Sequence, residues 1–262
     1  MRKTLLIAFA AIAFTLDANA LGLRLFNHLS VGANVGTTGV GADIAMPVTK
    51  FFDIEAGVCV MPRIKYNTDL HLNLPTGAIN QYLPQPLDIN KVPIQGKLNM
   101  LNGKALVNFY PIPVSSFHIT VGAYFGKEDI AEVYNTIDGQ LMPVNQANEF
   151  IKQNNIPCDP IGLELGDYLL TPDAAGNVRA TLNTKNFKPY AGLGIGRAVP
   201  GKRIGFKFDL GALFWGSPEV VDHNGVSLTK QDLNGKDGGA FRIISKIKVY
   251  PVLSFRLCGK IF

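Results

Sequence analysis

Two histidine–serine pairs are the residues of this chain whose spacing could support chemistry. His28 and Ser30 lie two positions apart, as do Ser116 and His118. A histidine beside a hydroxyl group can act as the base that activates it for nucleophilic attack. In an extended strand, residues two positions apart share a face. Each pair could therefore work together if the chain placed it near a substrate.

Metal and thiol chemistry are less well supported. His71 and His223 lie far apart in segments rich in turn residues, with no Gly-x-Ser-x-Gly motif beside them. The three cysteines, Cys59, Cys158 and Cys258, are odd in number and widely spaced. They fit neither a disulfide framework nor a zinc site. We predict no metal site and no cofactor.

Alternation of apolar and polar residues is the main structural signal. From Phe52 to Tyr66 the even positions are apolar, whereas the odd positions include Asp53, Glu55 and Arg63. A soluble β-sandwich or lipocalin-like barrel is the alternative fold, but it would have to bury those charges. A membrane barrel instead directs apolar residues to lipid and polar residues to its lumen. We predict an all-β fold, an eight-stranded antiparallel transmembrane β-barrel with long external loops.

Eight segments alternate in this way, and bacterial outer-membrane barrels have even strand numbers. They are residues 28–35, 40–46, 52–66, 97–110, 117–125, 187–196, 203–214 and 241–262. Short connections typically face the periplasm and longer ones the outside. The short connections are 47–51, 111–115 and 199–202, and the external ones are the tight turn 37–39 and the long segments 67–96, 127–186 and 217–240. The acidic segment 127–186 is expected to fold inward as a lid or to stand out as an adhesive surface.

The first twenty residues have the features of a signal peptide. Arg2 and Lys3 precede an apolar run, and Ala18-Asn19-Ala20 offers a small-x-small cleavage site. The run is too short to cross about 30 Å of hydrocarbon. We predict that residues 1–20 are removed and that 21–262 form the barrel in the outer membrane of a Gram-negative bacterium. Expected partners are outer-membrane lipid, lipopolysaccharide, the barrel-assembly machinery and a small solute.

Nine charged side chains on the predicted inward faces form the candidate site. They are Asp43, Asp53, Glu55, Lys104, Lys188, Lys207, Asp209, Lys248 and Arg256. An eight-stranded interior is about filled by its own side chains. The nine residues could form a plug of ion pairs or a narrow charged pathway that the same pairs gate. Three inward glycines, at 192, 194 and 196, leave room either for a solute or for bulky neighbours. The candidate neighbours are Tyr124, Tyr190 and Trp215.

Two function classes are disfavoured. The formal charge of +5 comes from scattered residues, without a basic helix or a patch of interleaved aromatics, so we expect no nucleic-acid partner. Small barrels that modify lipid A act on the external leaflet, whereas both histidine–serine pairs fall at predicted periplasmic strand ends. We therefore predict no enzymatic activity.

Three stretches resemble the CarO-like family of small outer-membrane barrels. They are 34–41 (NVGTTGVG), 188–196 (KPYAGLGIG) with 205–212 (GFKFDLGA) and 216–218, and 250–255 (YPVLSF). The resemblance implies an eight-stranded barrel in the outer membrane, of a kind discussed as a channel for small, often cationic, amino acids. On this analogy we expect a minor channel or uptake barrel for small solutes. The alternative is a non-conducting structural or adhesive surface barrel that acts through its external loops.

The C-terminal strand contains one conflict of register. Counting back from Phe262 in steps of two gives Lys260, Cys258 and Arg256, whereas Leu257 and its neighbours occupy the apolar parity. One extra residue in a β-bulge would switch the facing of everything beyond it. Glycine tolerates the positive φ that such a bulge needs. We predict a bulge within Cys258-Gly259-Lys260 that returns Phe262 to the lipid side.

Overall fold

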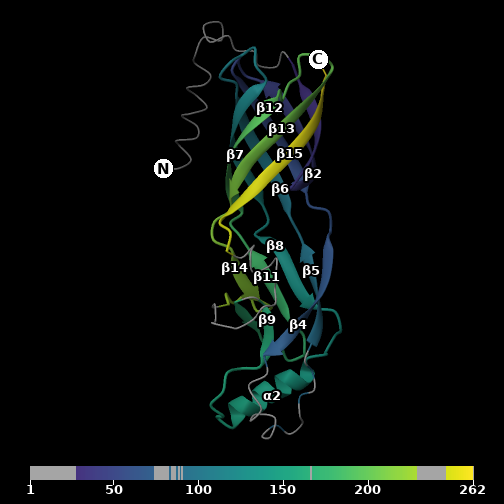
Figure 1. Cartoon of the computed structure of the whole chain (residues 1–262), viewed down its shortest axis with the longest axis vertical. Coiled ribbons are helices and arrows are strands. Elements are labelled where there is room, and N and C mark those ends of the chain that lie inside the picture. Colours follow the sequence, from purple (N-terminus) through teal and green to yellow (C-terminus); the bar gives the residue numbers. More distant parts are fainter. Residues whose placement is uncertain are drawn as a thin grey trace.

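Two β-regions are stacked along the long axis of the molecule (Figure 1). The computed structural model describes residues 28–73, 83, 87, 89, 91–165, 167–228 and 246–261. The predicted signal peptide lies outside the described residues. The C-terminus lies at the end of the barrel farthest from helix α2 (Met142–Gln153).

The first region is a closed antiparallel barrel of eight strands, as predicted. Its neighbour order is β1-β15-β13-β12-β7-β6-β3-β2. The strands are β1 (Ser30–Gly36), β2 (Gly39–Pro47), β3 (Phe52–Val60), β6 (Leu101–Phe109), β7 (Phe117–Gly126), β12 (Phe187–Gly196), β13 (Ile204–Phe214) and β15 (Val249–Lys260). Most have about the 9–11 residues that a tilted strand needs to cross a bilayer.

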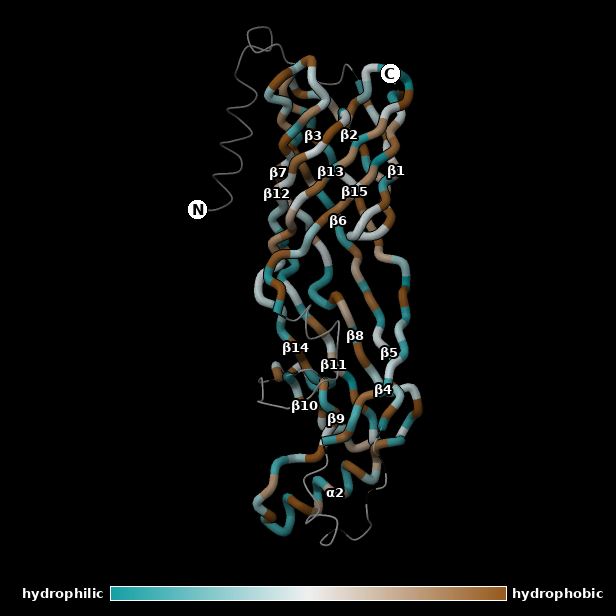
Figure 2. The backbone as a smooth tube through the Cα atoms, viewed as in Figure 1, coloured by the Kyte–Doolittle hydropathy of each residue, from teal (hydrophilic) through white to brown (hydrophobic). Residues whose placement is uncertain are grey.

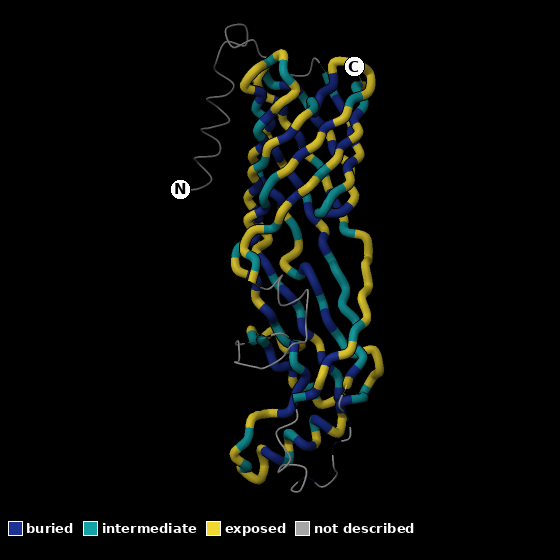
Figure 3. Tube along the Cα trace, viewed as in Figure 1, coloured by how far each residue is buried: buried dark blue, intermediate teal, exposed yellow. Residues whose placement is uncertain are grey.

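The outer surface of this barrel is an apolar belt (Figures 2 and 3). Outward-facing residues such as Val58, Leu193 and Leu210 are more than half exposed, although they are apolar. Aromatic rings lie near both borders of the belt: Phe52 stacks on Phe109 at one border, and the rings of Phe125 and Phe187 meet in a tilted arrangement at the other. Their ring centroids are 5.0 and 5.3 Å apart. An apolar belt between aromatic girdles is the surface that a transmembrane barrel presents to lipid.

No helix in the described part of the chain is long and apolar enough to span a membrane.

The second region, here called the extension, continues five of the barrel strands. Its sheet order is β10-β9-β4-β5-β8-β11-β14. The barrel order β3-β6-β7-β12-β13 is repeated in it as β4-β5-β8-β11-β14, because each of these strands directly precedes or follows its barrel counterpart in the chain. The strands are β4 (Lys65–Asn73), β5 (Lys91–Leu98), β8 (Asp129–Asn135), β9 (Gly162–Leu165), β10 (Tyr168–Leu170), β11 (Arg179–Asn183) and β14 (Glu219–Asp222).

The long connections are therefore external, as predicted, but much of their length is folded. Segment 127–186 forms β8, α2 and β9 to β11, so it stands out from the barrel. The described parts of the extension enclose a buried apolar cluster that includes Leu70, Ile94, Leu163 and Leu182. Helix α2 contributes Val144, Ala147 and Ile151 to this cluster. The sequence pattern did not predict this second core.

The alternation along the third predicted strand does not continue unbroken to Tyr66. Strand β3 ends at Val60, residues 61–64 are irregular, and β4 begins at Lys65. β3 buries the odd positions Asp53 and Glu55, whereas β4 buries the even positions Leu70 and Leu72. The break lets the chain change the face that it turns inward as it leaves the membrane.

The predicted bulge at 258–260 is wrong. Strand β15 keeps regular register with β1 through Lys260, and Gly259 lies opposite both Val31 and Ile204. Gly259 is not among the glycines with positive φ. The partners of β15 in both neighbouring strands are consecutive at Gly259, so no extra residue is inserted there. Phe262 lies outside the described residues.

Candidate functional site

The barrel interior contains a network of charged side chains around Asp43 on β2. One Asp43 oxygen accepts hydrogen bonds from Asn34 Nδ2 at 2.7 Å and Lys104 Nζ at 2.8 Å. The other accepts one from Arg256 Nε at 2.5 Å. The three donors come from β1, β6 and β15, so this single carboxylate connects strands from different parts of the barrel wall.

Glu55 on β3 extends the network across the lumen. Its carboxylate accepts hydrogen bonds from Lys104 Nζ at 2.6 Å and Lys207 Nζ at 3.1 Å. Lys207 Nζ also lies 2.9 Å from Asp209 Oδ2. The two lysines therefore link three carboxylates.

His118 on β7 ends this chain of contacts. Its Nε2 lies 2.8 Å from Asp209 Oδ1, and its Nδ1 lies 3.3 Å from the Ser116 carbonyl oxygen. Thr120 donates a further hydrogen bond of 3.3 Å to Asp209. A side chain at Gly194 would collide with the His118 ring, so this inward glycine makes room for a neighbour.

The interior network alternates in charge. Its six principal members are Asp43, Glu55, Lys104, Lys207, Asp209 and Arg256. None of these residues is more than 7 % exposed. Removing charges from water is expensive unless each is paired and hydrogen-bonded, and these charges have at least one ion-pair partner each.

An apolar layer lies on the external side of the interior network. It consists of Cys59, Leu106, Tyr124, Tyr190, Leu213 and Val252, all buried. The Tyr124 and Tyr190 rings meet edge to face, with centroids 5.6 Å apart. A Cβ at Gly192 or Gly211 would come within 2.5 Å of the Tyr190 hydroxyl, so these glycines also accommodate a bulky side chain.

Three predicted site residues lie apart from the network, two of them at the external end. Lys188 is buried near the external end of β12, beyond Tyr190, and donates to Asn102 Oδ1 at 3.2 Å and to the Lys127 carbonyl at 3.1 Å. Lys248 does not line the lumen, which corrects the prediction. It is exposed and precedes β15, because the segment leading to that strand belongs to the external end.

Asp53 occupies the opposite end of the barrel, near the turn between β12 and β13. It is buried beside the Tyr110 hydroxyl. That hydroxyl accepts a hydrogen bond of 3.0 Å from the Ala198 backbone N–H, and the Ala198 carbonyl accepts one of 2.7 Å from Arg256 Nη1. Ala198 and Val199 are buried, so this turn folds over the mouth of the barrel.

Sequence reasoning missed several members of this arrangement. His118 belongs to the interior network, although its spacing from Ser116 had made it a candidate for hydroxyl activation. Asn34 and Thr120 join the network from inward positions that the alternation already indicated. The inward turn at Ala198 had no sequence signal, because alternation describes strands and says nothing about turns.

The described residues contain no group of three or more His, Cys, Asp or Glu side chains arranged to hold a metal ion.

Comparison with known proteins concerns the fold. No protein-family model matches the chain. No curated protein matches it either. Among solved structures, crystal structures of Acinetobacter baumannii CarO2 and CarO are similar at 15 and 16 % identity, each with a TM-score of 0.46. The alignments cover 89 and 88 % of this chain and 98 and 96 % of those chains.

A major outer membrane protein from Thermus thermophilus is similar at 14 % identity with a TM-score of 0.32, over 89 % of this chain and 98 % of that one. The closed eight-stranded barrel and its apolar belt identify this chain as an outer-membrane β-barrel.

Proposed function

We propose that the chain is a non-conducting outer-membrane barrel that acts at the cell surface through its extension. The proposal favours a structural or adhesive surface barrel over a channel. The observation that carries the proposal is the filling of the lumen at three successive levels. These are the turn at Ala198, the interior network and the apolar layer.

The degree of burial supports a closed lumen. A water-filled pore would leave charged lumen residues wet, but Lys207 and Arg256 are each 1 % exposed. Ion passage would require the network to separate and expose unpaired charges in a confined space. It would also require Tyr124 and Tyr190 to leave the apolar layer. Both changes carry a free-energy penalty for a barrel whose interior is about filled by its own side chains.

The extension supports a role at the surface. It has its own buried cluster, which spanning a membrane does not require. Its surface has a hollow of about 620 Å³ beside α2, lined in part by Asn148, Glu149 and Lys152. A second hollow, of about 420 Å³, is lined in part by Tyr134 and Arg179. Concave sites with a few polar groups are where ligands usually bind.

Conductance of the purified, refolded barrel in planar bilayers tests the proposal. We expect no stepwise current from the wild-type protein, because the lumen is filled. The double variant Tyr124→Ala/Tyr190→Ala removes two rings from the apolar layer, and it should also stay non-conducting because the interior network and the turn at Ala198 still fill the lumen. Steady single-channel steps from the wild type, together with solute entry in a liposome-swelling assay, would overturn the proposal and support a channel instead.

A further inference from the structure

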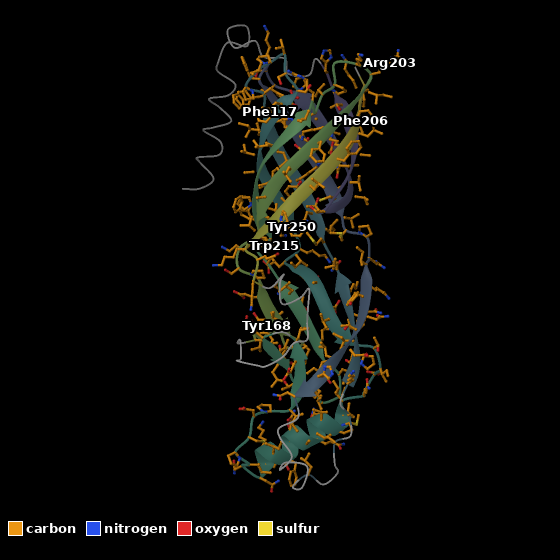
Figure 4. The ribbon with its side chains drawn as sticks, viewed as in Figure 1. Phe117, Tyr168, Arg203, Phe206, Trp215 and Tyr250 are labelled. Carbon is orange, nitrogen blue, oxygen red and sulfur yellow. The ribbon has the colours of Figure 1, made fainter. Side chains whose placement is uncertain are left out.

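The end of the barrel opposite the extension carries cations from three separate places in the chain. Lys50 lies in the turn between β2 and β3, Lys202 and Arg203 lie in the turn between β12 and β13, and Lys260 ends β15. We call these four residues the periplasmic rim, since short connections mark the periplasmic side. Figure 4 labels Arg203 at this end of the barrel.

Neighbouring residues place this rim at the level of lipid head groups. Lys50 directly precedes Phe51, Arg203 precedes Ile204, and Lys260 precedes Ile261. The three apolar residues are 42, 66 and 59 % exposed, as expected for the border of the lipid-facing belt. Lys50, Lys202 and Arg203 lie exposed in turns at this level, whereas Lys260 shares the inward parity of β15. Long cationic side chains at such a border keep their stems near the hydrocarbon and extend their charge into the head-group region.

The rim cations have no acidic partner among the described residues. No described carboxylate lies within ion-pair distance of any of them. Asp53 is the carboxylate nearest this end in the described chain, and it is only 3 % exposed beside Tyr110. Arg197 is not counted in the rim, because it donates to the Pro113 and Ser115 carbonyls.

We propose that the periplasmic rim binds the anionic head groups of phospholipids in the periplasmic leaflet. Each basic residue close to an anionic lipid surface contributes about 1 kcal/mol of attraction. Lys50 and Lys260 also line a hollow of about 420 Å³ at the barrel mouth, together with Asp53, Arg197 and Gly201. The Lys260 backbone N–H donates to the Arg203 carbonyl oxygen at 2.9 Å, so these two rim residues are neighbours.

Lipid selectivity, measured by electron spin resonance, tests this proposal. The full barrel is reconstituted in phosphatidylcholine vesicles with trace spin-labelled phosphatidylglycerol or phosphatidylcholine, and the motionally restricted fraction of each label is compared. We expect a preference for phosphatidylglycerol of roughly fivefold, which corresponds to about 1 kcal/mol. It should fall towards onefold in about 1 M sodium chloride, where the Debye length is about 3 Å.

The variant Lys50→Gln/Arg203→Gln/Lys260→Gln should lose this preference. It should still change its mobility on gels after boiling, which shows that the barrel is folded before heating. A matched variant, Lys91→Gln/Lys152→Gln/Arg179→Gln, removes the same charges from the extension and should keep the wild-type preference. An unchanged preference in the rim variant would overturn the proposal. If the rim variant does not fold, the salt dependence of the wild-type lipid preference tests the proposal instead. A preference that is unchanged in about 1 M sodium chloride would contradict electrostatic binding at the rim.

Two further outcomes identify other ligands. Inorganic phosphate, added against a chloride control of equal ionic strength, should not displace the lipid label. Displacement by phosphate alone would indicate a site for the free anion, and it would overturn the lipid assignment. Binding of the wild type to purified peptidoglycan, lost in the rim variant and without any lipid preference, would assign the surface to that polymer instead.

Discussion

Five of the eight barrel strands continue into the extension in the same neighbour order, yet the interiors of the two regions differ in chemistry. Inside the barrel, Asp43, Glu55 and Lys104 form ion pairs. Inside the extension, Leu163 and Leu182 pack in an apolar cluster. Figure 2 shows the apolar residues spread along both regions, and Figure 3 shows which of them are buried.

The surroundings of each region explain this difference. In the membrane, apolar side chains are favoured on the outside, and the narrow lumen receives the polar parity of every strand. In water, removal of apolar surface is the main force that stabilises a fold, so the extension turns its apolar parity inward. Trp215 and Tyr250 lie where the two regions meet, with ring centroids 4.7 Å apart (Figure 4). Alternation therefore gives each strand an apolar face and a polar face, and the surroundings, lipid or water, determine which face is buried.

Removing one interior charge should have the largest effect. Glu55→Gln leaves Lys104 and Lys207 each with one carboxylate fewer, and breaking a buried pair typically costs about 3–5 kcal/mol. Urea unfolding of the reconstituted barrel measures this loss. Glu149→Gln, on the exposed side of α2, should change the free energy of unfolding by less than about 0.5 kcal/mol.

The double variant Glu55→Gln/Lys207→Met sharpens this result. It removes one partner of each sign, so it should lose less stability than the sum of the two single variants. Strict additivity, or equal effects of Glu55→Gln and Glu149→Gln, would contradict the interior network as a stabilising unit.

An apolar truncation should have its effect on the other region. Leu163→Ala removes a fully buried side chain from the extension cluster and should destabilise the extension by about 2–5 kcal/mol. Limited proteolysis should then cleave the extension faster, while the barrel keeps its heat-dependent gel shift. Ile137→Ala, at an exposed extension residue, is the control and should leave proteolysis unchanged. Loss of the barrel shift in Leu163→Ala would show that the two regions do not open separately.

A charge placed on the outer surface should distinguish lipid from water. Leu210 lies near the middle of β13 and is 58 % exposed on the apolar belt. Leu210→Arg should cost about 2–4 kcal/mol, the usual cost of arginine near the bilayer midplane. Val226→Arg, at a similarly exposed extension residue, should cost less than about 0.5 kcal/mol. If both variants lower the free energy of unfolding in urea equally, then either Leu210 does not face lipid or Val226 does not face water.

The barrel strands were predictable because alternation is a local property that each segment carries by itself. Inward positions such as Asp43, Glu55 and Lys207 followed from the same parity. The extension was not predictable in this way, since β9 and β10 have only four and three residues. Such short strands give little periodicity, and β9 pairs with β4, which lies some ninety residues earlier in the chain.

The amino-acid sequence alone determined that the chain forms eight alternating strands with charged inward faces, because side-chain direction in a strand follows from position. Only the tertiary structure decided which charges meet. Asp43 and Arg256 are 213 residues apart in the chain, and barrel closure between β1 and β15 makes them partners. The absence of a bulge at Gly259 was also decided by the tertiary structure, because a bulge is defined by the register with the neighbouring strands, and both ladders are regular at this residue. Lys248 lies outside the lumen because it precedes β15, and alternation sets the direction of a side chain only within a strand.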